Sequence, residues 1–463
     1  MVICHSFFYE ICYLPGKTLL FLKFYSAYLL SCGMFSQSFY YEILLVSAAE
    51  LKAKALNWAH QFRLVAFYEN NQTSYKYNGF QNILAVSNAQ LLSFKSADAF
   101  QELKAAVQNQ NNNILCTLLS YDLKNQVENL NSQHPDYIQF PQIYYFQPEI
   151  YLHFHPDHLQ IFSSEEVNKT ILNQILAVPR PTTTSNQTIP IQPRISKAAY
   201  LQTIAAIKND ILNGEIYEMN YCMEFFAEQV KVEPLPLFLS LNSLSPMPFA
   251  GYVKLADKYL LCASPERFIK KTGTKLLSQP IKGTIARGKT PEQDEHNREK
   301  LRTDEKEIAE NMMIMDLVRN DLSKSCAIGS VQVEEMFGIY GFEQVFQMIT
   351  TVSGQLRPDC HPVDALKNAF PMGSMTGAPK IRAMQLIEQY EKTRRGLYSG
   401  SLGYFLPDGD FDFNVIIRSL QYNATTGYLS FMVGGAITYD SDPEQEYQEC
   451  LLKAAAILKI LQL

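Results

Sequence analysis

The sequence of 463 residues lacks any dense run of Lys or Arg, and its formal net charge is −6. Nonspecific nucleic-acid binding needs a basic surface that neutralises phosphates, so the charge argues against this class and favours a small-molecule partner. The chain also lacks an uninterrupted apolar run of about 20 residues, which a membrane-spanning helix requires. A signal peptide fits poorly, because the charges near the N-terminus do not precede one single apolar stretch.

Cysteine clusters and nucleotide-binding motifs are absent as well. The nine cysteines are scattered, without a CxxC pair or the His-spaced cluster that a zinc site needs. We therefore expect reduced thiols in a cytoplasmic protein. No glycine-rich segment has the spacing of a Walker loop or a dinucleotide fingerprint. What is present is apolar material, 47% of the residues, enough for one large domain or two of medium size.

Composition divides the chain into four parts. The first is apolar but interrupted by charges, and we expect an extension upstream of a start at Met34, or else a disordered or interfacial tail. A β-rich lobe follows, and a connector with four prolines separates it from a second lobe that carries the remaining motifs. The expected parts are residues 1–33, 34–178, 179–193 and 194–463.

Local patterns predict individual elements. Residues 143–146 and 150–154 have the β-branched and aromatic character of strands. The polar run Gln108–Asn113 has no apolar anchor and predicts an exposed loop. In the second lobe, Ser196 is expected to cap a helix that ends just before Gly214.

Two acidic pairs lie on predicted helices. In each pair the separation of i, i+3 puts both carboxylates on one face. Four carboxylates that converge from two helices would suit a hard divalent cation such as Mg²⁺. The alternative for either pair alone is a solvated helix face. The pairs are Glu307 with Glu310, and Glu446 with Glu449.

Glycine-rich segments and two basic residues are further candidates. Residues 373–380, 398–403 and 434–436 expose backbone N–H groups that could bind carboxylates, or they are only turns. Arg418 follows an apolar, strand-like run and could hold a carboxylate by two hydrogen bonds, or it forms an internal ion pair. Lys282 stands in a turn-like segment, where a fixed amine can act as a nucleophile or as the charge partner of a carboxylate.

Taken in order, seven segments resemble the chorismate-utilising enzymes over roughly residues 195–463. The resemblance implies an α+β fold in which two large antiparallel β-sheets pack face to face with helices outside, and chorismate and Mg²⁺ lie in a central cleft. The segments are SPERF (264–268), PIKGT (280–284), EIAENMMIMDLVRND (307–321), GSMTGAPKIRAM (373–384), YSGSLGYF (398–405), IIRSL (416–420) and GGAITYDSDPEQEYQE (434–449).

The same resemblance implies roles for individual positions of this catalytic lobe. The two acidic pairs would hold Mg²⁺, directly or through water. Glu266 would be the general acid that assists departure of the ring hydroxyl. The substrate would be bound by Thr284, Thr376, Lys380, Tyr398, Arg418, Gly434 and Gly435.

Three positions distinguish reactions within the family. Where isochorismate and salicylate synthases place a lysine that activates water, this chain has Glu218. Where anthranilate synthases usually have the sequence PIAGT, this chain has Lys282 in place of the alanine. Gln347 stands in place of a histidine that takes part in pyruvate elimination in anthranilate synthases. The chain is therefore most similar to the component I group of aminodeoxychorismate synthases. The alternatives are component I of anthranilate synthase and a catalytically silent chorismate-binding subunit.

This resemblance predicts an aminating enzyme of p-aminobenzoate and folate synthesis. Neutral Lys282 would attack the ring and expel the C4 hydroxyl, and ammonia would then displace the lysine. Such an amine needs a pKa that is lowered by desolvation or by nearby Mg²⁺. No Cys in a tight glycine-rich turn is paired with a downstream His-x-Glu, so we expect ammonia from a separate glutamine amidotransferase subunit.

Overall fold

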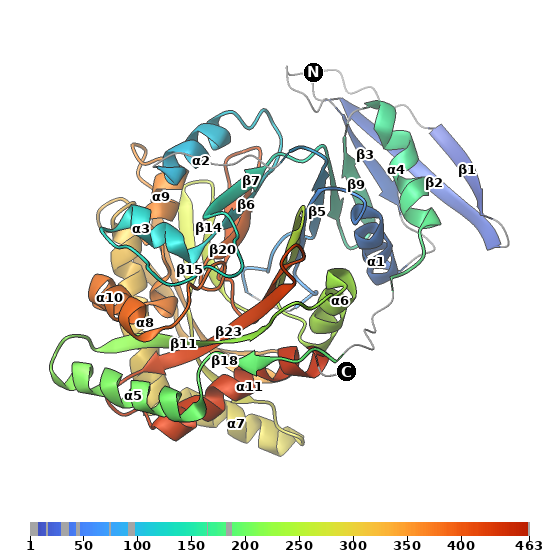
Figure 1. The fold of residues 1–463 in the computed structure, drawn as a ribbon. Helices are drawn as coiled ribbons and strands as arrows, with labels where there is room; N and C mark the ends of the chain where they lie inside the picture. The colour runs from blue at the N-terminus through green and yellow to red at the C-terminus, as the bar shows by residue number, and fades with distance from the viewer. Residues whose placement is uncertain are drawn as a thin grey trace.

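Strands supply the centre of the structure (Figure 1). The computed structural model describes residues 8–14, 17–28, 37–42, 47–73, 76–90, 98–163, 165–181 and 188–461, with the backbone alone for 8–42 and 165–169. The strands form one 14-stranded and one 9-stranded sheet, and every strand pair named is antiparallel. In the described part of the chain, no helix is long and apolar enough to span a membrane.

The larger sheet contains strands from both ends of the chain. Strand β4 pairs with β12, which joins the N-terminal half to the C-terminal half within one hydrogen-bonded sheet. In sheet order the strands are β1 (Phe8–Leu14), β2 (Lys17–Tyr28), β3 (Gln37–Glu42), β9 (His158–Phe162), β8 (Ile150–Phe154), β5 (Ile83–Ser87), β4 (Leu64–Glu69), β12 (Phe249–Leu255), β13 (Lys258–Ser264), β22 (Ser419–Asn423), β23 (Tyr428–Ile437), β11 (Glu218–Ala227) and β10 (Gln192–Pro193), and β19 (Gly377–Ala378) pairs with β11.

The smaller sheet is also shared, because β6 pairs with β20. The two expected lobes are thus stretches of sequence that contribute adjoining blocks of strands to common sheets. In sheet order the strands are β16 (Ile281–Ala286), β18 (Val345–Gln355), β15 (Lys275–Gln279), β14 (Arg267–Thr272), β21 (Phe411–Asn414), β20 (Ser401–Phe405), β6 (Leu115–Leu119) and β7 (Ile143–Phe146), and β17 (Gln332–Gly341) pairs with β18.

Helices cover the outer faces of the sheets, and Figure 1 shows α5 and α11 along β11 and β23. The expected cap of α5 is confirmed, because the Ser196 side chain accepts a hydrogen bond from the backbone N–H of Ala199. The helices are α1 (Ala48–Ala59), α2 (Ala99–Gln108), α3 (Lys124–Val127), α4 (Glu165–Ala177), α5 (Lys197–Leu212), α6 (Pro234–Leu244), α7 (Pro291–Thr303), α8 (Glu305–Ser323), α9 (Pro362–Ala369), α10 (Lys380–Tyr390) and α11 (Pro443–Leu461), with short 3₁₀ turns η1 (Tyr121–Leu123) and η2 (Gly373–Met375).

Three apolar clusters separate these layers. One lies between the sheets, where Phe80 contacts Phe249 and Tyr68 edge to face. Tyr404 contacts Tyr68 edge to face and Phe80 at a tilt. A second lies under α1, α4, α5, α6 and α11, and a third lies under α2, α8 and α9. The expected α+β fold, with two antiparallel sheets face to face and helices outside, is confirmed.

Local predictions had mixed outcomes. The strands expected at 143–146 and 150–154 are β7 and β8. The expectation that no residue of the polar run 108–113 is buried is wrong, because Gln110 and Asn113 are buried. The Asn113 side chain donates a hydrogen bond to the Pro148 carbonyl, and the Gln110 side chain donates to the Phe405 carbonyl. Burial of an amide side chain costs little free energy when its polar atoms keep such hydrogen-bond partners. Part of the expected connector, 182–187, lies outside the described residues.

Candidate active site

A cavity of about 570 Å³ opens between the two sheets and helices α8 and α11. Its volume is within the range of small-molecule sites. All but two of the site residues expected from the sequence line it, although they come from distant parts of the chain. These residues are Glu266, Lys282, Thr284, Glu307, Glu310, Tyr398, Arg418, Gly434, Gly435, Glu446 and Glu449.

The topology explains how Glu266 and Arg418 meet. Each lies where the chain crosses between sheets: Glu266 between β13 and β14, and Arg418 between β21 and β22. The backbone N–H of Val415 donates to the Glu266 carbonyl at 3.0 Å, which joins the two crossings. Arg418 has a φ of 51°, a region that non-glycine residues seldom occupy and that is often found at functional sites.

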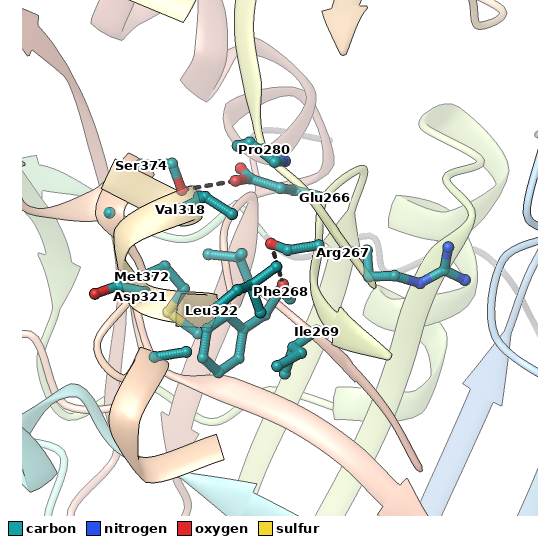
Figure 2. A pocket seen from close by; sticks show the side chains of 14 residues that line it. Glu266, Arg267, Phe268, Ile269, Pro280, Val318, Asp321, Leu322, Met372 and Ser374 are labelled. Atoms are coloured by element: carbon teal, nitrogen blue, oxygen red, sulfur yellow. Dashed lines mark hydrogen bonds between the residues drawn. The ribbon is translucent and has the colours of Figure 1, made fainter. Parts of the chain in front are cut away.

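Glu266 is a buried carboxyl group in an apolar setting. It also borders a second, small space of about 20 Å³, shown in Figure 2 with Phe268, Leu322 and other mostly apolar neighbours. Burial raises the pKa of Glu266 to about 7, although the hydrogen bond that Ser374 Oγ donates to Glu266 Oε1 at 2.6 Å opposes the rise. A carboxyl group that is protonated near neutrality can act as a general acid.

Lys282 bridges the two sheets. Its Nζ donates to Glu218 Oε1 at 2.8 Å, from β16 of the smaller sheet to β11 of the larger. The side chains are 10% and 1% exposed. Burial lowers the pKa of Lys282, but Glu218, Glu310 and Glu266 outweigh this effect and raise it above its usual value. The surrounding carboxylates thus oppose the lowered pKa that the covalent route needs from desolvation or from nearby Mg²⁺.

Arg418 presents a charge to the cavity without a carboxylate partner. Among the described residues no ion pair reaches its guanidinium, so the alternative of an internal ion pair does not hold there. Burial lowers the pKa of Arg418 to about 10, and Glu266 opposes the fall only partly. Tyr398 is a buried residue of the wall of the same cavity. An unpaired guanidinium of this kind is suited to an anionic ligand.

The four acidic residues of α8 and α11 face the same cavity but stay apart. Within the described ranges, no three His, Cys, Asp or Glu side chains are close enough together to hold a metal ion. Lys306 Nζ lies between the helices, 3.3 Å from Glu446 Oε1 and 3.7 Å from Glu310 Oε1. Lys453 Nζ lies 2.7 Å from Glu449 Oε1. Lysine ammonium groups thus partly neutralise the carboxylates.

The charges of this region nevertheless fit an added cation. Burial raises the pKa of Glu310 to about 7, and Lys282 only partly opposes it. The Oε1 atom of Glu310 is buried and accepts no hydrogen bond from the described residues. Burial and the neighbouring Glu449 also raise the pKa of Glu307. A divalent cation that prefers oxygen ligands would stabilise the charged form of these buried carboxylates.

Glycine is required where α11 approaches β23. A Cβ atom on Gly435 would lie 3.2 Å from Glu446 Oε2, tighter than most real contacts, and a Cβ on Gly434 would lie 2.4 Å from the Tyr221 carbonyl oxygen. The absence of side chains here lets the carboxylates of α11 approach the strand. Next to Lys282, Gly283 has a φ of +94°, which also favours glycine.

Two predicted residues do not line the cavity. Lys380 Nζ donates to Asp321 Oδ2 at 2.8 Å and to the Ala369 carbonyl at 3.0 Å. Thr376 is fully buried, and its hydroxyl donates to the Met372 carbonyl at 3.1 Å. Both side chains support the turn before α10, and their assignment to substrate binding stays a prediction.

Sequence reasoning missed Lys306, Lys453 and Ser374. Lys306 precedes the predicted metal ligand Glu310 by four residues, and Lys453 follows the predicted ligand Glu449 by four. This helical spacing could have identified both lysines. Ser374 could not have been identified, because its partner lies 108 residues away in sequence.

Comparison with known proteins agrees with this geometry. The chain is 42% identical over 270 residues to "Probable aminodeoxychorismate synthase, chloroplastic" of Oryza sativa, which covers 58% of this chain but only 30% of the rice protein. It is 34% identical to "Aminodeoxychorismate synthase component 1" of Bacillus subtilis and also 34% identical to "Anthranilate synthase component 1" of Thermus thermophilus. Each match covers 74% of this chain and 76% of the relative.

Solved structures include a similar fold. The crystal structure of anthranilate synthase component I from Streptococcus pneumoniae superposes with a TM-score of 0.70 at 26% identity, covering 86% of this chain and 92% of that one. The family described as "chorismate binding enzyme" matches residues 59–459, a range that contains every residue of the cavity described above. The chain therefore belongs to the family of chorismate binding enzymes.

Proposed function

We propose that this chain is the synthase subunit that converts chorismate and ammonia to 4-amino-4-deoxychorismate, the precursor of p-aminobenzoate in folate synthesis. A separate glutamine amidotransferase subunit would supply the ammonia. The observation that carries the proposal is the presence of Lys282 and Glu266 in one cavity, an amine next to a carboxyl group whose pKa is about 7. Aminodeoxychorismate synthases are among the relatives of the chain.

Charge and size support chorismate, a dianion, as the ligand. The Arg418 guanidinium, which lines the cavity together with Tyr398, would bind one carboxylate by two hydrogen bonds. The second carboxylate would lie toward α8 and α11. There Glu307, Glu310 and the two acidic residues of α11 would hold Mg²⁺, which supplies positive charge against the ring carboxylate.

Two residues would carry out the displacement of the C4 hydroxyl, one as the nucleophile and one as the general acid. Lys282 Nζ would form a bond to the ring while the C4–O bond breaks, and Glu266 would give its proton to the departing hydroxyl, which leaves as water. Ammonia would then add at C4 as the bond to Lys282 breaks. A covalent route of this type replaces one difficult displacement by two easier ones.

The chain lacks the residues that related enzymes use for attack by water and for elimination of pyruvate. Attack by water loses its usual base, since Glu218 stands in place of the lysine of isochorismate synthases and is bound to Lys282 at 2.8 Å. Anthranilate synthase component I is the second candidate, because the Thermus relative is as similar as the Bacillus one. Lys282 and the buried Gln347, which also lines the cavity, favour amination without elimination of pyruvate.

Product analysis tests the proposal. The purified chain is incubated with chorismate, Mg²⁺ and an ammonium salt, and the products are separated by chromatography and identified by mass. We expect aminodeoxychorismate, with none formed by Lys282→Ala, while Lys52→Ala, which removes a lysine far from the cavity, should retain activity. Anthranilate or isochorismate as the product would refute the assignment. No turnover, even with an amidotransferase, would indicate a silent binding subunit.

A further inference from the structure

Lys282, which lines the cavity, forms an enclosed ion pair with Glu218 behind the cavity wall. Glu218 is the first residue of β11 and its carboxylate is 1% exposed. One carboxylate oxygen accepts the 2.8 Å hydrogen bond from Lys282, and the other, Oε2, is buried and accepts none from the described residues. Among described residues, Lys282 Nζ has no other ion-pair partner within 4 Å.

An ammonium group cannot attack a carbon atom until it loses a proton. Several acidic groups act on the charge of Lys282, and the positive charge of Lys453 acts on it as well. The acidic groups are Glu218 on β11, Glu266 at the sheet crossing, Glu307 and Glu310 on α8, and Glu449 on α11. These charges favour the ammonium form. A proton acceptor at the amine is therefore required for the proposed route.

We propose that Glu218 is this acceptor and takes a proton from Lys282 Nζ as the amine attacks the ring. This inference rests on the proposed function. One N–H bond of Lys282 breaks and one O–H bond forms on Glu218 Oε1. The freed electron pair then forms the bond to the ring, while Glu266 protonates the hydroxyl that leaves. Glu218 returns the proton to Lys282 when ammonia displaces the amine.

Geometry favours Glu218 over the other acidic groups. It alone accepts a hydrogen bond from Lys282 Nζ in the described structure, whereas Glu266 Oε1 already accepts one from Ser374. Proton transfer needs direct hydrogen-bond contact or one intervening water. Because Glu218 Oε2 accepts no hydrogen bond in the described structure, Glu218 can take up a proton without breaking a hydrogen bond to any other residue.

The variant Glu218→Gln separates proton transfer from simple charge pairing. If the carboxylate only holds the ammonium form, its loss lowers the pKa of Lys282 and makes the amine more reactive near neutral pH. If it accepts the proton, its loss slows the reaction although the amine is more readily deprotonated. The two roles therefore predict changes of opposite sign.

The experiment follows adduct formation on Lys282 in single-turnover mixtures with chorismate and Mg²⁺ but no ammonia, quenched and read by mass, from pH 6 to 9. We expect Glu218→Gln to react about 100-fold more slowly at pH 7, within the usual range for general bases. Its rate should rise about tenfold per pH unit, because solvent must then remove the proton. Glu218→Asp should recover part of the rate.

The control is Glu69→Gln, which breaks a comparable Glu–Lys pair, 2.9 Å from Lys52 and outside the cavity. It should match the wild type at every pH. A Glu218→Gln rate equal to or above the wild-type rate at pH 7, or a slow rate that does not depend on pH, would overturn the inference alone. An unmodified wild-type Lys282 would overturn both the inference and the covalent mechanism. Calorimetry with chorismate confirms that the variant cavity is intact.

Discussion

Replacing Glu266 by Gln should make the protein more stable at alkaline pH while it removes activity. The folded-state pKa of Glu266 is about 7, because burial disfavours its charged form, whereas an unfolded glutamate titrates near 4.3. Between these values the folded protein keeps a proton that the unfolded chain loses, so wild-type stability falls as pH rises through this window. At 1.36 kcal/mol per pKa unit, the full loss is about 4 kcal/mol, of which about 3 kcal/mol falls between pH 4.5 and pH 8.

Glutamine cannot titrate and can still accept the Ser374 hydrogen bond through its side-chain oxygen. The free energy of unfolding of Glu266→Gln, relative to wild type, should therefore increase by about 3 kcal/mol from pH 4.5 to pH 8. Urea unfolding at several pH values, followed by fluorescence, measures this difference. Activity with ammonium salt should fall by about 100-fold or more, the usual effect of losing a general acid.

Glu334→Gln supplies a control of opposite sign. Lys275, Ser353 and Tyr77 overcome the effect of burial and lower the pKa of Glu334 to about 2. Its stabilising effect is present above the unfolded pKa and is lost as pH falls, so this variant should be less stable than wild type near pH 7. A flat pH dependence for the stability difference of Glu266→Gln, or full activity in that variant, would refute the role of Glu266.

Three further predictions concern charged residues. The Lys306→Met variant should bind Mg²⁺ about tenfold more tightly by calorimetry, because Lys306 forms ion pairs with two carboxylates of the expected ligand set. The control Lys300→Met, on the exposed face of α7, should leave the affinity unchanged. Weaker Mg²⁺ binding by Lys306→Met would contradict this prediction. Arg418→Met should raise the KM for chorismate about 10- to 100-fold and also raise the Tm, since an unpaired buried charge is removed; an unchanged KM would exclude carboxylate binding. Lys380→Met should lower the Tm, because the buried Asp321 loses one of its two lysine partners, and a normal Tm with a raised KM would indicate that Lys380 binds substrate instead.

The two-sheet fold could be predicted from the family resemblance, and individual elements could be predicted because their signals are local. Apolar periodicity and a serine cap identified α5, and aromatic, β-branched runs identified β7 and β8. The burial of Gln110 could not be predicted, since its acceptor, the Phe405 carbonyl, lies 295 residues away. The sharing of both sheets by the two halves of the chain was hidden for the same reason, because pairing of β4 with β12 is a long-range event.

The site was predictable to the extent that motifs carry it. The segments around Lys282 and the acidic helices identified residues that the cavity brings together. Sequence alone treated Lys282 and Glu218 as two separate indicators of the reaction, whereas the fold joins them at 2.8 Å. Whether a lysine faces substrate or a structural carboxylate is a tertiary property, so the contact of Lys380 with Asp321 could not be predicted from sequence.

The most direct test of covalent amination is to look for the lysine adduct itself. The chain is mixed with chorismate and Mg²⁺ without ammonia, quenched, digested and mapped by mass. We predict that the peptide containing Lys282 carries the chorismate ring less one water, that added ammonium salt removes this mass, and that Lys282→Ala never acquires it. An unmodified Lys282 peptide in an enzyme that still forms aminodeoxychorismate would contradict the covalent role of the lysine.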